Sequence, residues 1–81
     1  MSNGRIAYGQ GDVIFREGDP ATGAFLVESG TVTISTAGED GHVVLATLGP
    51  GDLFGEIAML EASTRAGTAI AASACELMVV D

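Results

Sequence analysis

The chain has 81 residues, of which 47% are hydrophobic and 17% charged, with a formal net charge of −8. This length allows one domain, residues 1–81, and the apolar content excludes a disordered chain. Eleven acidic residues against three arginines and no lysine exclude a general basic surface for nucleic acid or anionic lipid. Any anion site must therefore be built locally, from one arginine and backbone N–H groups.

Cys75 is the only cysteine, so an internal disulfide is excluded and a reducing compartment is indicated. We expect Cys75 to behave as a small buried hydrophobe rather than as a reactive thiol. No apolar run of signal-peptide type begins the chain, and none reaches the roughly 20 residues that span a bilayer. These features predict a cytoplasmic protein without a membrane segment.

Short apolar segments, rich in β-branched residues, alternate with turn signals along the whole chain. The segments are Val13–Phe15, Ala24–Glu28, Val32–Ser35, Val43–Leu48, Asp52–Phe54, Thr68–Ala72 and Glu76–Val80. The turn signals between them include Glu17–Pro20, Ser29–Gly30, Gly38–Gly41 and Gly49–Asp52. This spacing predicts an all-β sandwich or barrel.

Three local features refine that prediction. Thr31–Ser35 alternates polar and apolar residues and should form a hairpin with His42–Leu48. Glu56–Glu61 has good helix formers but room for only one or two turns, so it predicts a short helical insert. Gly9–Phe15 resembles Gly49–Phe54, which suits a jelly roll in which one turn and strand recur in facing layers.

Residues 54–68 combine residue types that suit a sugar phosphate. Gly55 lets a ligand approach the backbone, and the start of the expected helix presents the free N–H groups of Ile57 and Ala58. The carboxylate of Glu56 can accept a hydrogen bond from a sugar hydroxyl. The planar guanidinium of Arg65 can contact two phosphate oxygens.

The same segment resembles the phosphate-binding segment of the cyclic nucleotide-binding domain family. It reads Phe-Gly-Glu-Ile-Ala at 54–58 and Arg-Ala-Gly-Thr at 65–68, and the likeness extends upstream through Gly18–Pro20, Ser29–Gly30 and Gly49–Asp52. The resemblance implies an eight-stranded β-roll, or double-stranded jelly roll. In that family, two helices usually follow the last strand of the roll and cover the nucleotide base. The chain ends one residue after Val80, so we expect these lid helices to be absent and the domain to be truncated there.

The resemblance also implies a role for individual residues. Glu56 would bind the ribose 2′-hydroxyl, and Arg65 with the amides of Ile57 and Ala58 would bind the cyclic phosphate. Ala66 lacks the hydroxyl that often contacts guanine in relatives that bind cyclic GMP, so cyclic AMP is the expected ligand. Phe54 and Gly55 complete the ligand-binding set, and Ile34 and Leu45 are candidates for the pocket wall.

Taken alone, each of these residues also has a purely structural explanation. Glu56 could serve the helix dipole, and Arg65 could pair on the surface with Glu56 or Glu61. Ile34 and Leu45 are equally well explained as core positions. Only the combined spacing of these residues within segment 54–68 favours a ligand site.

The sequence leads to three hypotheses about function. The first is a non-enzymatic cyclic nucleotide sensor that controls an effector outside the chain, with a homodimer left open. The second is a degenerate jelly roll that serves protein interaction or dimerisation without a ligand. The third, a cupin-like metalloenzyme, needs two or three histidines, and His42 is the only histidine, so we expect no metal site and no catalytic residues.

Overall fold

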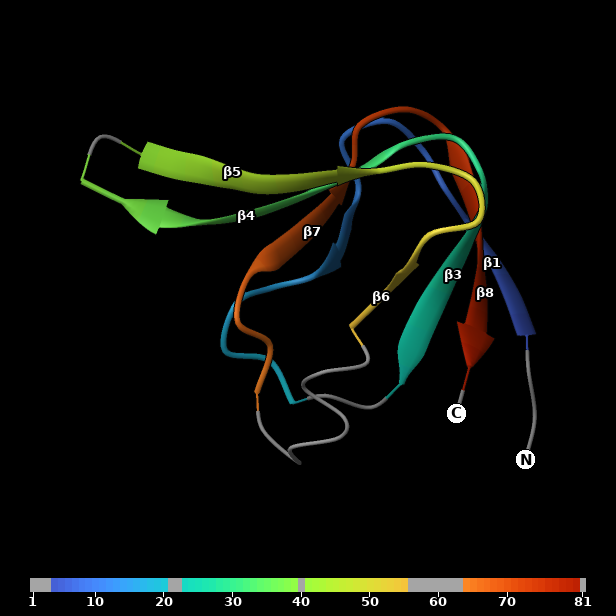
Figure 1. Cartoon of the computed structure of the whole chain (residues 1–81), viewed down its shortest axis with the longest axis horizontal. Coiled ribbons are helices and arrows are strands. Elements are labelled where there is room, and N and C mark those ends of the chain that lie inside the picture. Colours follow the sequence, from blue (N-terminus) through green and yellow to red (C-terminus); the bar gives the residue numbers. More distant parts are fainter. Residues whose placement is uncertain (1–3, 21–22, 40, 56–63, 81) are drawn as a thin grey trace.

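The computed structural model describes residues 4–20, 23–39, 41–55 and 64–80. Eight strands lie in these residues: β1 (Gly4–Tyr8), β2 (Val13–Phe15), β3 (Ala24–Ser29), β4 (Val32–Gly38), β5 (Gly41–Leu48), β6 (Leu53–Phe54), β7 (Thr68–Ala71) and β8 (Cys75–Val80). They form two antiparallel sheets, ordered β1-β8-β3-β6 and β2-β7-β4-β5 (Figure 1). The all-β roll expected from the sequence is confirmed. The short helix expected at Glu56–Glu61 lies outside the described residues.

Strand β1 is the one described strand that the apolar segments do not predict. It pairs in continuous register with β8, from Gly4 opposite Val79 to Tyr8 opposite Cys75. Its first four residues are all exposed. A strand with little burial on either face has no apolar alternation, so its signal in the sequence is absent.

The predicted hairpin is confirmed as β4 and β5, which pair from Val32 opposite Leu48 to Gly38 opposite Gly41. It extends well beyond the rest of the sandwich in Figure 1. The register shifts once, because Ile34 faces Ala46 while Ser35 faces Val44, which leaves Leu45 without an opposite residue. Such a β-bulge re-aims the side chains around it.

The core lies between the two sheets. Val27, Phe54 and Leu77 come from one sheet and pack with buried residues of the other sheet, which are Val32, Ala69 and Ala71. Cys75 belongs to this cluster and is 4% exposed, as expected for a small hydrophobe. Burial, followed by the negative charge of Asp12, raises the pKa of its thiol, which keeps it protonated and unreactive at neutral pH.

One four-residue turn occurs three times, at Gly9–Asp12, Arg16–Asp19 and Gly49–Asp52. In each turn the N–H of the final aspartate donates to the carbonyl of the first residue, at 3.0 Å. The aspartate carboxylate in return accepts the N–H of the first residue, at 2.8 to 2.9 Å. The third residue is glycine with φ between +88° and +91°, as a type II turn requires.

Each of these turns also holds one residue of another segment through two backbone hydrogen bonds. The glycine N–H donates to the carbonyl of that residue, whose own N–H donates to the aspartate carbonyl. The residues held are Ala71 by Gly9–Asp12, Val27 by Gly49–Asp52 and Arg65 by Arg16–Asp19. The resemblance between Gly9–Phe15 and Gly49–Phe54 therefore corresponds to a repeated turn that holds another segment by its backbone. A third copy of this turn, Arg16–Asp19, positions Arg65.

No helix in the described ranges has the length and apolar character needed to cross a membrane.

Candidate functional site

Arg65 lies between the bridge of Thr64 to Pro20 and the start of β7. Its N–H donates to the carbonyl of Asp19, and its carbonyl accepts the N–H of Gly18, both at 2.8 Å. The residue is 4% exposed. Because its backbone is fixed at both polar atoms, the side chain starts from a defined position.

The guanidinium of Arg65 is bound by backbone carbonyls. Nη1 donates to the carbonyl of Gly55 at 2.8 Å, and Nη2 donates to the carbonyl of Gly23. Nε is buried and has no hydrogen-bond partner among the residues that the structure describes. The one salt bridge between described residues joins Arg5 and Glu28, so no carboxylate of the described ranges forms a salt bridge with Arg65. Arg65 is buried and therefore not a surface side chain, and its two candidate ion-pair partners, Glu56 and Glu61, lie outside the described residues.

An unneutralised buried cation is costly to keep in a protein. Burial lowers the pKa of the Arg65 guanidinium below its usual range, and the nearby Asp19 carboxylate opposes that shift. An arginine stays protonated at neutral pH even so. The site therefore carries a fixed positive charge and an unsatisfied donor, the two properties that an anion would satisfy together.

Gly55 lies directly against this cation. Its φ is +86°, and a Cβ built on it would stand 2.6 Å from Nη1 of Arg65. The sequence predicts that this glycine allows a close approach to the backbone. The group that makes this approach in the structure is the arginine side chain.

The other predicted site residues are placed differently from one another. Phe54 is buried, so its ring belongs to the core beneath the site. Ala66 is exposed beside Arg65. Ile34 is partly buried and lies against Gly67, where an added Cβ would meet its Cγ2 at 3.1 Å. Leu45 is 58% exposed on the bulge, so it is not a core position. Glu56, Ile57 and Ala58 lie outside the described residues.

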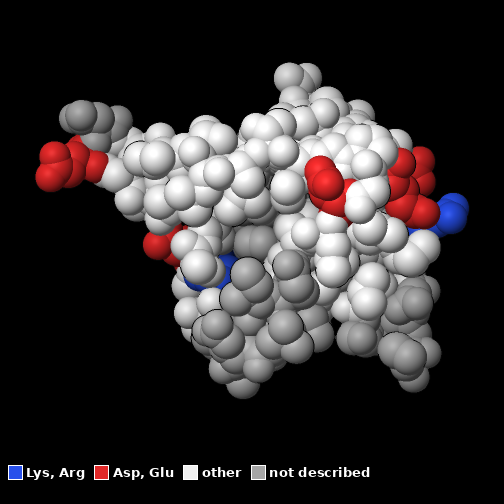
Figure 2. Space-filling model, in the orientation of Figure 1, with Lys and Arg blue, Asp and Glu red and all other residues white. Residues whose placement is uncertain are grey.

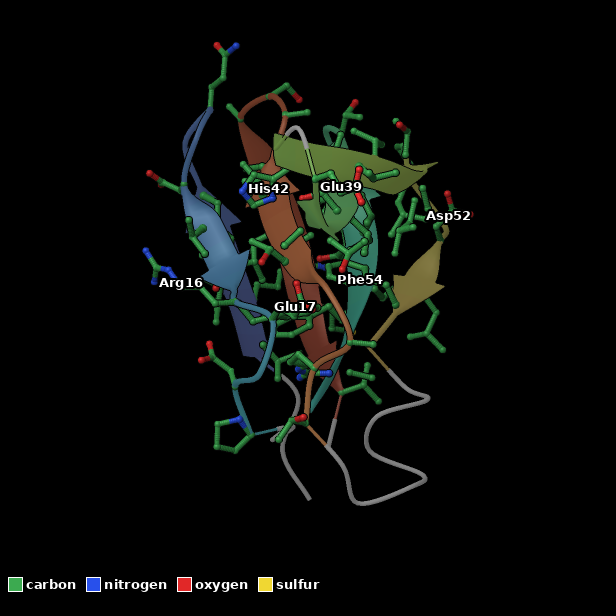
Figure 3. All side chains as sticks on the ribbon, turned by 90° about the vertical axis from the view of Figure 1, so that its left-hand side faces the viewer. Arg16, Glu17, Glu39, His42, Asp52 and Phe54 are labelled. Atoms are coloured by element: carbon green, nitrogen blue, oxygen red, sulfur yellow. The ribbon has the colours of Figure 1, made fainter. Side chains whose placement is uncertain are left out.

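The surface charge agrees with a local anion site. Figure 2 shows acidic side chains at the two ends of the visible face, with the uncharged surface of the β4–β5 hairpin between them and a smaller acidic group beside a basic group below the hairpin. In Figure 3 Arg16 points away from the sandwich, whereas Phe54 lies inside it. The visible surface thus offers no broad positive field, and the buried charge of Arg65 acts at short range.

Sequence reasoning missed four residues that position Arg65. Gly18 and Asp19 hold its backbone, the Gly23 carbonyl accepts from its guanidinium, and the Phe15 ring lies under it at 4.3 Å from Cζ to the ring centroid. One signal could have revealed the turn, because Gly-Asp recurs at 11–12, 18–19 and 51–52.

Comparisons with known proteins place the sequence and the fold among known relatives. Residues 5–81 match the family model described as cyclic nucleotide-binding domain. The chain is 39% identical to the cyclic AMP receptor protein of Thermus thermophilus over 77 residues, which cover 94% of this chain and 36% of that protein. It is 44% identical to acetyltransferase Pat of Mycolicibacterium smegmatis over 62 residues, or 76% of this chain and 19% of the relative.

A solved structure has a similar fold. It is the co-crystal structure of the regulatory domain of Toxoplasma gondii PKA with cAMP, which superposes with a TM-score of 0.92 and 32% identity. The match covers 96% of this chain and 30% of the other. The present chain thus spans about a third or less of the lengths of these three relatives.

Proposed function

Because this chain belongs to the cyclic nucleotide-binding domain family, we propose that it binds a cyclic nucleotide and signals its presence to an effector. The observation that carries this proposal is the buried Arg65, a cation without a described carboxylate partner and with a free donor at Nε. A cyclic phosphate supplies one negative charge and acceptor oxygens at the required place. Charge-assisted hydrogen bonds of this kind are among the strongest in proteins.

The remaining contacts are assigned residue by residue. Gly55 brings the backbone beside the phosphate and leaves space for Arg65. The amides of Ile57 and Ala58 complete the phosphate site, and Glu56 accepts from the ribose 2′-hydroxyl. Phe54 supports these groups from the core, and we assign Ile34, which packs against the core beside Gly67, to the wall of the ligand pocket. Leu45 is exposed on the bulge of β5, so we assign it to the outer part of the pocket wall.

The preferred ligand in this proposal is cyclic AMP. Ala66 is exposed next to Arg65 and has no hydroxyl with which to bond the guanine amino group. Cyclic GMP would therefore gain no contact there that cyclic AMP lacks.

The role of the 81 residues is that of a regulatory unit, with no catalytic step assigned to them. The Thermus receptor protein and the Mycolicibacterium acetyltransferase both contain the similar segment within a longer chain. We place the effector outside these 81 residues, in the same protein or in an associated one.

Isothermal titration calorimetry of the full chain with cyclic AMP tests the proposal. We expect saturable binding at one site per chain, with weaker binding of cyclic GMP and of acyclic 5′-AMP. Absence of binding at millimolar cyclic AMP, in a chain shown to be folded by circular dichroism, would contradict the proposal and favour the degenerate jelly roll. Tighter binding of cyclic GMP would overturn the role of Ala66 alone.

A further inference from the structure

All three phenylalanines of the chain meet beneath Arg65. Phe15 comes from β2, Phe25 from β3 and Phe54 from β6, so the cluster joins the two sheets. Ring centroids lie 5.9 Å apart for Phe15 and Phe25, 6.0 Å for Phe15 and Phe54, and 5.3 Å for Phe25 and Phe54. Such a set of rings forms a continuous aromatic surface at the site end of the core.

Arg65 lies over one ring of this cluster in particular. Its Cζ is 4.3 Å from the centroid of Phe15 and 5.8 Å from that of Phe25. A guanidinium within about 6 Å of a ring centroid is attracted by the negative face of the ring. The distances make Phe15 the principal partner, with Phe25 at the limit of the range.

The contact with the Phe15 ring restricts movements of the Arg65 guanidinium that its hydrogen bonds alone would allow. The carbonyls of Gly55 and Gly23 hold Nη1 and Nη2 at one end of the guanidinium. The ring of Phe15 covers one face of the group and keeps water from that face. The guanidinium is therefore held before a ligand arrives, and the N–H groups that these two bonds do not use, including that of Nε, keep a fixed place.

We propose that Phe15 is a positioning residue for anion recognition, because its π face holds the Arg65 guanidinium in the orientation that receives the cyclic phosphate. The inference rests on the proposed function and adds to it a residue outside segment 54–68. Losing the ring would require Arg65 to be ordered on binding and would expose the guanidinium to water, and both effects weaken affinity.

Substitution at position 15 separates this role from simple packing. We expect Phe15→Leu to weaken cyclic AMP binding about tenfold, from the strength of a desolvated cation–π contact. Phe15→Tyr keeps the aromatic face and should restore most of the affinity. Leu77→Val is the matched control, since Leu77 is completely buried on β8 and is not part of the site. It should lower stability in urea without changing affinity.

Site-specific fluorination of the Phe15 ring provides the second test, and it does not depend on whether Phe15→Leu folds. Successive fluorines weaken the negative face while they leave the ring and its packing in place. Affinity for cyclic AMP should fall stepwise with fluorine number. An affinity that ignores fluorination, or that survives Phe15→Leu in a folded chain, overturns the inference. Absence of binding by the wild-type chain would instead remove the proposed function, and the inference with it.

Discussion

Replacing Gly30 with alanine is expected to lower the free energy of unfolding by about 3 kcal/mol, a large part of the stability of so small a domain. Gly30 has a φ of +84°, which costs a residue with a Cβ about 1–2 kcal/mol. An added Cβ would also overlap the carbonyl oxygen of Ala74 and the Cα and Cβ of Cys75. These atoms belong to backbone and core, so they cannot move aside cheaply.

Gly11→Ala is the matched control for this prediction. Gly11 has nearly the same φ, +88°, but nothing lies within 4 Å of its built Cβ. It should therefore lose only the conformational part, about 1–2 kcal/mol. Urea denaturation of both variants measures the difference. Equal destabilisation of the two would show that the contact of Gly30 with the start of β8 is unimportant.

Replacing Arg65 with methionine should weaken cyclic AMP binding by about 2–5 kcal/mol, or about 30-fold to several thousand-fold. Methionine retains much of the side-chain length and removes the charge and all the donors. The cyclic phosphate would then face a desolvated site without a cation. Binding is measured by calorimetry, and folding by circular dichroism, because the Gly55 and Gly23 carbonyls lose a partner too.

Arg16→Met provides the control for net charge. Arg16 belongs to the turn that holds Arg65 but is exposed, and its own part in the turn is made by backbone atoms. Both variants change the charge of the chain from −8 to −9. We expect Arg16→Met to bind within about twofold of wild type, since exposed charges are strongly screened. An equal loss in both variants would assign the effect to overall charge rather than to the site.

Much of the β-roll was predictable from local sequence. The β4–β5 hairpin follows from alternation on Thr31–Ser35 and the glycines at 38 and 41, which meet as its closing pair. Strand β1 was not predictable, because its residues are mostly exposed and its place depends on pairing with β8, about 70 positions away. The bulge that leaves Leu45 without an opposite residue is likewise set by pairing and not by composition.

For the site, the sequence indicated which residues to examine but not how they are arranged. Arg65 and Gly55 stood out by their spacing and by the scarcity of basic residues. The clamp at Gly18 and Asp19, the Gly23 carbonyl and the ring of Phe15 come from segments 42 to 50 residues earlier in the chain. Only the folded sandwich brings them to Arg65, so neither the burial of its charge nor the close contact with Gly55 could be anticipated.

The central claim is that the cyclic phosphate is received by Arg65, and NMR of the arginine Nε–H groups during a cyclic AMP titration tests it directly. The chain has three arginines, so three signals are expected, and the Arg65→Met variant assigns one of them. We expect the Arg65 signal to shift in proportion to ligand occupancy while those of Arg5 and Arg16 stay in place. Saturation of the protein with cyclic AMP while the Arg65 signal remains unmoved would contradict it.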